Sequence, residues 1–211
     1  YSQTLPGAKH SHIVIEHLPS QQTQLINHPK AKLSKPLWSP KETKLAFLYR
    51  HDAICRIYQT PLTGAEDHNN WQTITDCNQD SQPTLVFSPD GNYLYFNDRQ
   101  SAQNGYQIFR VNLNSGEKDI VNQPITHGRG NYQFDISTDG NKLVMLNSEY
   151  APNSRIYTLD LTSSKLQQTA QLSYLMRSVI WHHDNQTLVH PSPHPAYELW
   201  QSDLNGNKLT V

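Results

Sequence analysis

The chain has 211 residues, of which 36% are hydrophobic, and a mean hydropathy of −0.70, so we expect one all-β domain whose core is built from many thin layers. The formal net charge is −1, and the Lys and Arg residues are scattered along the sequence. The chain therefore has no cluster of basic residues of the kind that binds nucleic acid directly. No apolar stretch approaches the roughly 20 residues that cross a bilayer, so we expect no membrane contact by this chain.

The first predicted element is a strand from Ile13 to Leu18, followed by a turn and a second strand from Thr23 to Ile26. Residues 1–5 fit only the end of a strand that precedes them. We therefore expect the chain to start inside a repeat, with a partial repeat at residues 1–32 and further sequence before Tyr1.

Four similar segments follow, each reading as two strands around a tight turn: LWSPKETKLAF at 37–47, VFSPDGNYLYF at 86–96, DISTDGNKLVM at 135–145 and IWHHDNQTLVH at 180–190. Their anchors Trp38, Phe87, Ile136 and Trp181 are 49, 49 and 45 residues apart. Asp-Gly or Asp-Asn at the turn tolerates a positive φ. The first segment has Lys41-Glu42 there, which predicts a less regular turn. We expect the four anchors to occupy equivalent buried positions.

A second signal follows each of these hairpins, an apolar residue with Leu five positions later: Ile57 to Leu62, Ile108 to Leu113, Ile156 to Leu161 and Leu199 to Leu204. Each is followed by turn residues and a short fourth strand. Four short strands every 45 to 49 residues predict a β-propeller of four-stranded antiparallel blades. We place complete blades at about 33–77, 78–126, 127–171 and 172–211.

The SPDG turn, the apolar strand after it and the Ile-Tyr pair resemble the WD40-like repeat of TolB and its relatives, and the resemblance covers nearly the whole chain. The segment at 86–96 matches best, whereas Thr138 replaces the proline in the next copy and the fourth copy departs further. This resemblance implies a ring of about six blades, so the ring formed by this chain is expected to be open, or completed by a partner or a second copy.

Catalytic signatures are absent from the sequence: it has no GxSxG elbow, no HExxH pair and no Gly-rich phosphate loop followed by Lys. We therefore expect no enzyme, no catalytic residues and no cofactor. His182, His183, His190 and His194 surround the fourth hairpin, but their spacing on a Pro-rich loop is not that of a metal site. They are interpreted as solvated loop residues, with pH sensing as the alternative.

A binding face is predicted from propeller geometry, because the loops between the second and third strands and those between blades gather at one end of the sheets and carry function. The polar and aromatic candidates there for a partner protein or small ligand are Arg50, His51, Arg99, Arg129, Tyr150, Tyr174, Arg177 and His194.

Cys55 and Cys77 flank the turn that joins the third and fourth strands of the first complete blade. In a roughly symmetric hairpin they face one another at disulfide distance, which predicts a bridge and an oxidising compartment such as the periplasm. The alternative is two reduced thiols in a cytosolic protein.

Two functions follow from the resemblance. The first is the periplasmic sensor of a bacterial membrane-anchored transcriptional regulator similar to CadC; the second is a TolB-like periplasmic scaffold for other proteins. A non-catalytic propeller of a prolyl oligopeptidase-type peptidase is a more distant third.

Overall fold

The computed structural model describes residues 1–4, 10–99, 105–121, 130–148, 153–192 and 198–209. These residues form antiparallel sheets joined by turns, and their one helical segment is a single 3-10 turn, η1 (His68–Asn70). None of the helical structure in this part of the chain has the length and apolarity needed to cross a bilayer. The all-β prediction is confirmed.

The chain divides into two compact units, residues 1–81 with 111–117 and residues 82–110 with 118–211. The predicted single-domain organisation and blade boundaries stay predictions.

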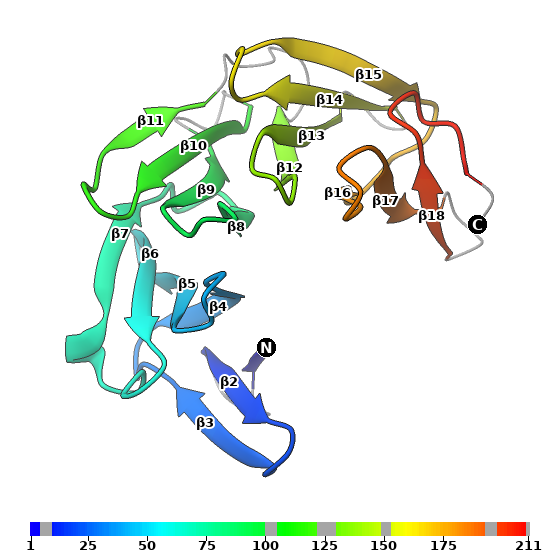
Figure 1. Ribbon diagram of the computed structural model, residues 1–211. Coiled ribbons are helices and arrows are strands. Elements are labelled where there is room, and N and C mark those ends of the chain that lie inside the picture. Colours follow the sequence, from blue (N-terminus) through cyan, green and yellow to red (C-terminus); the bar gives the residue numbers. More distant parts are fainter. Residues whose placement is uncertain (5–9, 100–104, 122–129, 149–152, 193–197, 210–211) are drawn as a thin grey trace. The chain divides into compact units, whose positions relative to one another are not determined.

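The first unit has two sheets, with strand orders β1-β2-β3 and β4-β5-β6-β7 (Figure 1). Their bounds are β1 (Ser2–Thr4), β2 (Ser11–His17), β3 (Gln22–Ile26), β4 (Lys32–Trp38), β5 (Lys44–His51), β6 (Ile54–Pro61) and β7 (Gln72–Asp76). The three-stranded sheet is the predicted partial blade, since β1 pairs with β2 and β2 with β3.

The described residues of the second unit form three sheets, ordered β11-β10-β9-β8, β12-β13-β14-β15 and β16-β17-β18. Their bounds are β8 (Leu85–Phe87), β9 (Tyr93–Asp98), β10 (Gln107–Asn112), β11 (Lys118–Ile120), β12 (Asn131–Ile136), β13 (Lys142–Ser148), β14 (Ser154–Asp160), β15 (Leu166–Leu172), β16 (Ile180–Trp181), β17 (Leu188–Pro191) and β18 (Leu199–Ser202). The last sheet has three strands where four were predicted, and a single bridge between Ser202 and Lys208 stands in place of the fourth.

The four predicted hairpins share one register. Each anchor pairs with the first apolar residue of the next strand: Trp38 with Leu45, Phe87 with Leu94, Ile136 with Leu143 and Trp181 with Leu188. The turn between them also repeats, because Glu42, Gly91, Gly140 and Asn185 all have φ between 53° and 75°. Glu42 adopts this left-handed conformation without glycine, so the expected irregularity of the first turn is wrong.

The core lies in thin layers between neighbouring sheets, because both faces of the second and third strands are covered. Four consecutive residues are buried in β5, from Leu45 to Leu48, and four in β13, from Leu143 to Leu146. In the second unit, Val144 and Ile156 pack with Met176 and Trp181 across adjacent sheets.

The prediction that all four anchors are buried is wrong for Trp38, which is 46% exposed, whereas the other three are 6–8% exposed. In the second unit β12 contacts β9, and β16 contacts β12. In the first unit β4 contacts β1 and β2, and the described residues there include no preceding first strand to cover the end of β4.

Candidate functional site

Arg50 lies at the loop end of β5 in the first unit, paired in register with Cys55. A disulfide joins Cys55 to Cys77, with Cα atoms 5.0 Å apart, and the Cys77 N–H donates to the Cys55 carbonyl at 3.0 Å. The Arg50 guanidinium donates to the carbonyl of Ser81. The segment from 77 to 81, which follows β7, is therefore fixed at both of its ends.

His51 lies next to Arg50, at the turn between β5 and β6. Its Nε2 is 3.4 Å from a carboxylate oxygen of Asp52, which is exposed and has a left-handed φ of 51°. Ile54, on the other side of this turn, is 43% exposed. The loop end of the first unit thus presents an apolar side chain beside an imidazole and a carboxylate.

Arg99 follows β9 in the second unit and its guanidinium lies over the Tyr106 ring, 4.6 Å from the centroid. The Arg99 Nη2 donates to the Tyr106 hydroxyl at 3.3 Å, and this hydroxyl also accepts the N–H of Gln82 at 3.0 Å. Arg99 is therefore held against the start of β10.

Tyr174 and Arg177 lie between β15 and β16. Tyr174 packs against the core of the second unit, and burial raises the pKa of its hydroxyl, whereas Arg177 is exposed. Between them, the Met176 N–H donates to Ser154 Oγ at 2.8 Å and the Met176 carbonyl accepts from the Tyr132 hydroxyl. The segment is thus anchored to the starts of β12 and β14.

Three predicted site residues, Arg129, Tyr150 and His194, lie outside the described residues. Of the other five, Arg50 and His51 belong to the first unit and Arg99, Tyr174 and Arg177 to the second. Within each unit they lie at the loop end of the sheets. The use of this end for binding stays a prediction.

The structure adds a feature at this end that the sequence analysis missed. Asn131, the first residue of β12, is paired in register with Asn147, and both side chains are buried, at 0% and 1% exposure. Within the described part of the chain, the side-chain oxygen and nitrogen of each have no hydrogen-bond partner. Asn97 lies beside them, since its Nδ2 donates to the Asn131 carbonyl at 2.9 Å.

Unpartnered buried amides are costly, at about 1–3 kcal/mol for each polar group. Such groups are uncommon in folded proteins, and each one calls for an explanation. Each of these two amides offers one acceptor and two hydrogen atoms for donation. The pair therefore carries both donors and acceptors that no described residue uses.

The histidines around the fourth hairpin are not all solvated loop residues. His190 is 3% exposed and its Nε2 is 3.1 Å from Ser202 Oγ, so the solvated interpretation is wrong for it. His182 and His183 have ring centroids 3.9 Å apart, and the Nδ1 of His182 lies 3.0 Å from a carboxylate oxygen of Asp184. Within the described ranges, no group of three or more His, Cys, Asp or Glu could hold a metal ion.

A different histidine cluster lies in the first unit. The rings of His28 and His68 have centroids 4.9 Å apart, and His68 packs on Trp71 at 4.4 Å. The His28 Nδ1 accepts the N–H of Lys30 at 3.2 Å, which requires an unprotonated Nδ1. Burial lowers the pKa of His28, and the nearby His68 lowers it further.

The TolB beta propeller domain family (PD40) matches residues 6–208. Among solved structures, TolB from Acinetobacter baumannii superimposes with a TM-score of 0.50 at 14% identity, over 99% of this chain and 61% of that one. A structure from a study of two prolyl endopeptidases gives a TM-score of 0.70 at 11% identity, over 100% of this chain and 34% of that one. These likenesses show the fold.

A curated 6-phosphogluconolactonase from Formosa agariphila is 30% identical over 87 residues, which are 41% of this chain and 24% of that protein. The similarity therefore spans about a quarter of that relative's length. The family match spans nearly the whole chain and agrees with the repeated hairpins and four-stranded sheets. This chain belongs to the TolB beta propeller domain family.

Proposed function

We propose that this chain is a protein-binding propeller module of the bacterial periplasm, and that the loop end of its sheets is the binding surface. The observation that carries the proposal is the pair of buried, unpartnered amides of Asn131 and Asn147 at the loop end of the second unit. A partner group that reaches them would satisfy donors and acceptors that folding leaves unused.

The neighbouring residues fit recognition of a polar or acidic partner segment. Arg99 is held in place by the ring and hydroxyl of Tyr106, so less side-chain entropy is lost when a partner carboxylate binds its guanidinium. Arg177, which is exposed at the same end of the unit, adds a second positive charge. Aromatic residues and Arg are also the types enriched at protein interfaces.

The periplasmic location is supported by the Cys55–Cys77 disulfide, because such bonds persist in oxidising compartments and are rare in the cytosol. Membership of a TolB-type family agrees with it. On this proposal the chain acts by binding and catalyses no reaction itself.

Two finer roles are compatible with a binding module. A TolB-like scaffold would hold other envelope proteins at the loop end. A sensor of a CadC-like membrane-anchored regulator would pass a signal on, and the His28–His68 pair favours this role because protonation of His28 conflicts with the Lys30 N–H. Binding that is independent of pH between 5 and 8 would favour the scaffold.

The test is site-specific photo-crosslinking in cells that produce the full-length protein. A photoreactive residue at position 177, on the loop end, is compared with one at Asn92, an exposed residue of a hairpin turn at the other end of the sheets. We expect a discrete adduct with one partner from position 177 and none from position 92. Equal adducts from both positions would contradict a loop-end interface.

A second variant tests the role of the amides. Asn147→Leu removes one unpartnered buried amide while roughly conserving volume, so it should stabilise the fold by about 1 kcal/mol or more and yet abolish the adduct from position 177. An undiminished adduct would show that the amides do not contribute to binding.

A further inference from the structure

A pocket of about 210 Å³ lies in the second unit, away from the loop end. It extends across β13, β14 and β15 of one sheet and is bordered by Trp181 of β16 and by Leu204. Its lining residues are Lys142, Thr158, Asp160, Ser163, Lys165, Gln167, Trp181 and Leu204.

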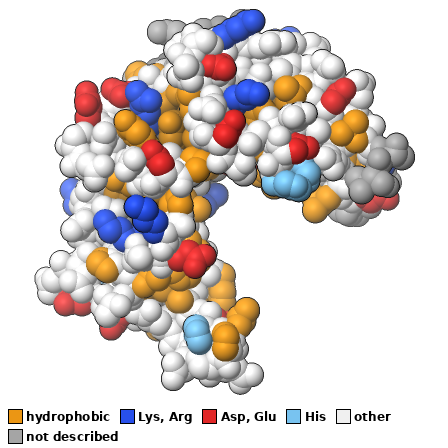
Figure 2. All heavy atoms as spheres, viewed as in Figure 1, with side chains coloured by type: hydrophobic (Ala, Val, Ile, Leu, Met, Phe, Trp, Pro, Cys, Tyr) orange, Lys and Arg blue, Asp and Glu red, His pale blue; other side chains and the backbone are white. Residues whose placement is uncertain are grey.

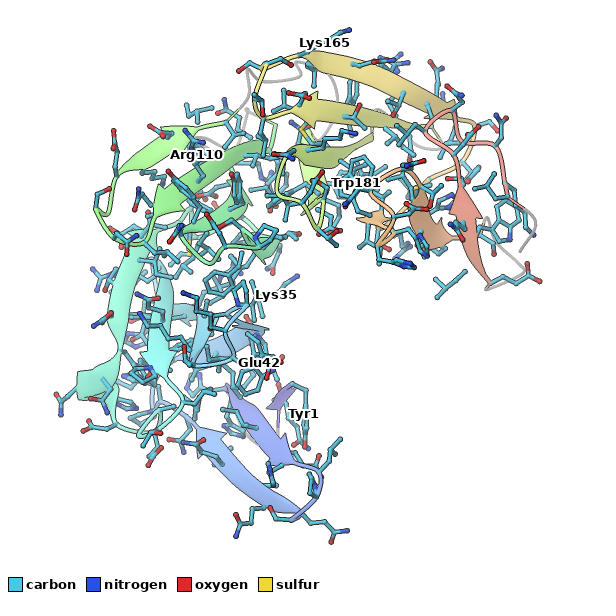
Figure 3. All side chains as sticks on the ribbon, viewed as in Figure 1. Tyr1, Lys35, Glu42, Arg110, Lys165 and Trp181 are labelled. Atoms are coloured by element: carbon cyan, nitrogen blue, oxygen red, sulfur yellow. A yellow bond between two sulfur atoms is a disulfide. The ribbon has the colours of Figure 1, made fainter. Side chains whose placement is uncertain are left out.

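The pocket belongs to the turn end of these sheets. Lys142 is the first residue of β13, directly after the Asp-Gly hairpin turn, and it pairs in register with Asp160, the last residue of β14. Lys165 immediately precedes β15, whereas Trp181 belongs to β16; Figure 3 labels both. The proposed loop-end surface is at the opposite ends of the same strands.

Two ammonium groups dominate the charge of this pocket. Neither Lys142 nor Lys165 has a carboxylate within ion-pair distance among the described residues. On the face shown in Figure 2, basic and acidic side chains are interspersed. The two ammonium groups lie at the wall of one pocket, so together they attract an anion to it.

Asp160 is the one acidic residue that lines the pocket. Its Oδ1 accepts the N–H groups of Thr162 and Ser163 and the Ser163 hydroxyl, at 2.7–3.1 Å, and these hydrogen bonds lower the pKa of the carboxyl. The carboxylate therefore stays ionised, and the formal charge around the pocket is one positive unit. A ligand with one acidic group and several hydroxyl groups suits this balance, since hydroxyls can donate to Asp160 and Gln167.

Trp181 supplies a second, independent observation. This residue is 6% exposed, and its indole Nε1 is buried with no hydrogen-bond partner among the described residues. The pocket wall thus includes the edge of a large, mostly buried apolar ring. A sugar ring combines apolar C–H faces with oxygen acceptors, and the pocket is smaller than those that take drug-sized ligands.

From this combination we propose that the pocket binds a monosaccharide carrying one acidic group, with the anionic group on Lys142 and Lys165 and the hydroxyls on Asp160, Thr158 and Gln167. The inference does not rest on the proposed function, because that function concerns the other end of the sheets.

The experiment is an NMR titration of the whole 15N-labelled chain, read at the indole N–H signal of Trp181. That signal is assigned from its loss in Trp181→Phe. The probes are glucuronate, glucose 6-phosphate, glucose and acetate. We expect glucuronate to shift the signal saturably with a Kd of about 1 mM, and glucose and acetate to bind at least about tenfold more weakly because each lacks one half of the recognised chemistry.

Variants separate this site from general electrostatic attraction. Lys142→Gln with Lys165→Gln should weaken glucuronate binding by about tenfold or more. Lys44→Gln is the matched control, since Lys44 and Lys142 donate or accept the same hairpin hydrogen bonds in their repeats, and it should leave binding unchanged. Lys165→Gln alone, on the exposed turn, should give an intermediate loss and covers the case in which the double variant does not fold.

The outcomes are distinct. No saturable shift with glucuronate at about 50 times the expected Kd, equal shifts with glucose, or unchanged affinity in the lysine variants would each overturn the proposal. Tighter binding of glucose 6-phosphate than of glucuronate would identify phosphate as the acidic group. Failure of the loop-end crosslink would leave this result untouched.

Discussion

The disulfide between Cys55 and Cys77 should make a large contribution to the stability of the first unit. The perturbation is Cys55→Ala with Cys77→Ala, which removes the bond while the backbone pairing of β6 with β7 remains. Cys55 is 3% exposed and alanine fits its place without introducing a buried polar group. The variant therefore reports mainly on the cross-link.

The magnitude follows from the length of the closed loop. The two cysteines are separated by 22 positions, and on the chain-entropy estimate closing such a loop stabilises the folded state by about 3.4 kcal/mol. With ordinary urea sensitivity this corresponds to a midpoint lowered by about 1 to 3 M.

The assay is urea unfolding followed by circular dichroism and by tryptophan fluorescence, since Trp71 packs on Phe47 within the first unit. The oxidised natural chain is compared with the double variant, with and without a thiol reductant. Reductant should lower the midpoint of the natural chain to that of the variant and leave the variant unchanged. Equal midpoints under oxidising conditions would refute the loop-closure reasoning, and two free thiols in protein from its native compartment would refute the periplasmic proposal.

Three further predictions concern single positions. Gly130→Ala should destabilise the second unit by about 2 to 4 kcal/mol, because the φ of Gly130 is 66° and a Cβ there would lie 2.5 Å from the Tyr106 backbone nitrogen. Gly116→Ala is the control: open space surrounds Gly116, so this change should cost only about 1–2 kcal/mol. Equal losses in the denaturation midpoints of the two variants would contradict the steric argument. Burial raises the pKa of the Asp135 carboxyl in the folded chain, so the stability that Asp135 contributes falls as the pH rises from its pKa in the unfolded chain through its pKa in the folded chain. Asp135→Asn should therefore raise the thermal midpoint at pH 7 and lose that advantage at pH 3, as measured by differential scanning calorimetry. Burial lowers the pKa of His28 from 6.5, so the stability that the neutral imidazole contributes is fully present above pH 6.5 and should decline on acidification toward pH 5. In urea unfolding measured at several pH values, His28→Gln should flatten this decline. An identical decline in the variant would exclude His28 as its source.

The local pattern of the chain was sufficient to predict the repeated hairpins. Turns are governed by short-range backbone preferences, so Asp-Gly at 90–91 and 139–140 predicted them, and the strands around them follow from short apolar runs. Even the Lys41-Glu42 turn forms, because the paired strands impose a left-handed conformation on Glu42. The local signal there was weaker than the tertiary constraint.

Burial at the anchors could not be predicted from the repeat alone. Trp38 has the same register as Trp181, yet it is exposed while Trp181 is buried. Burial of a residue on an innermost strand depends on the neighbouring sheet, and the pattern of its own hairpin does not contain that information.

The candidate sites show the same division between sequence and tertiary structure. The sequence by itself determined the fold class, the repeat spacing and which loops share one end of the sheets, because these depend on local periodicity and strand direction. Only the tertiary structure showed that Asn131 lies beside Asn147 and that His28 lies beside His68. The same holds for Lys142, Lys165 and Trp181, which line one pocket. Each of these groups joins residues from different strands or loops, so packing decides whether their polar atoms find partners.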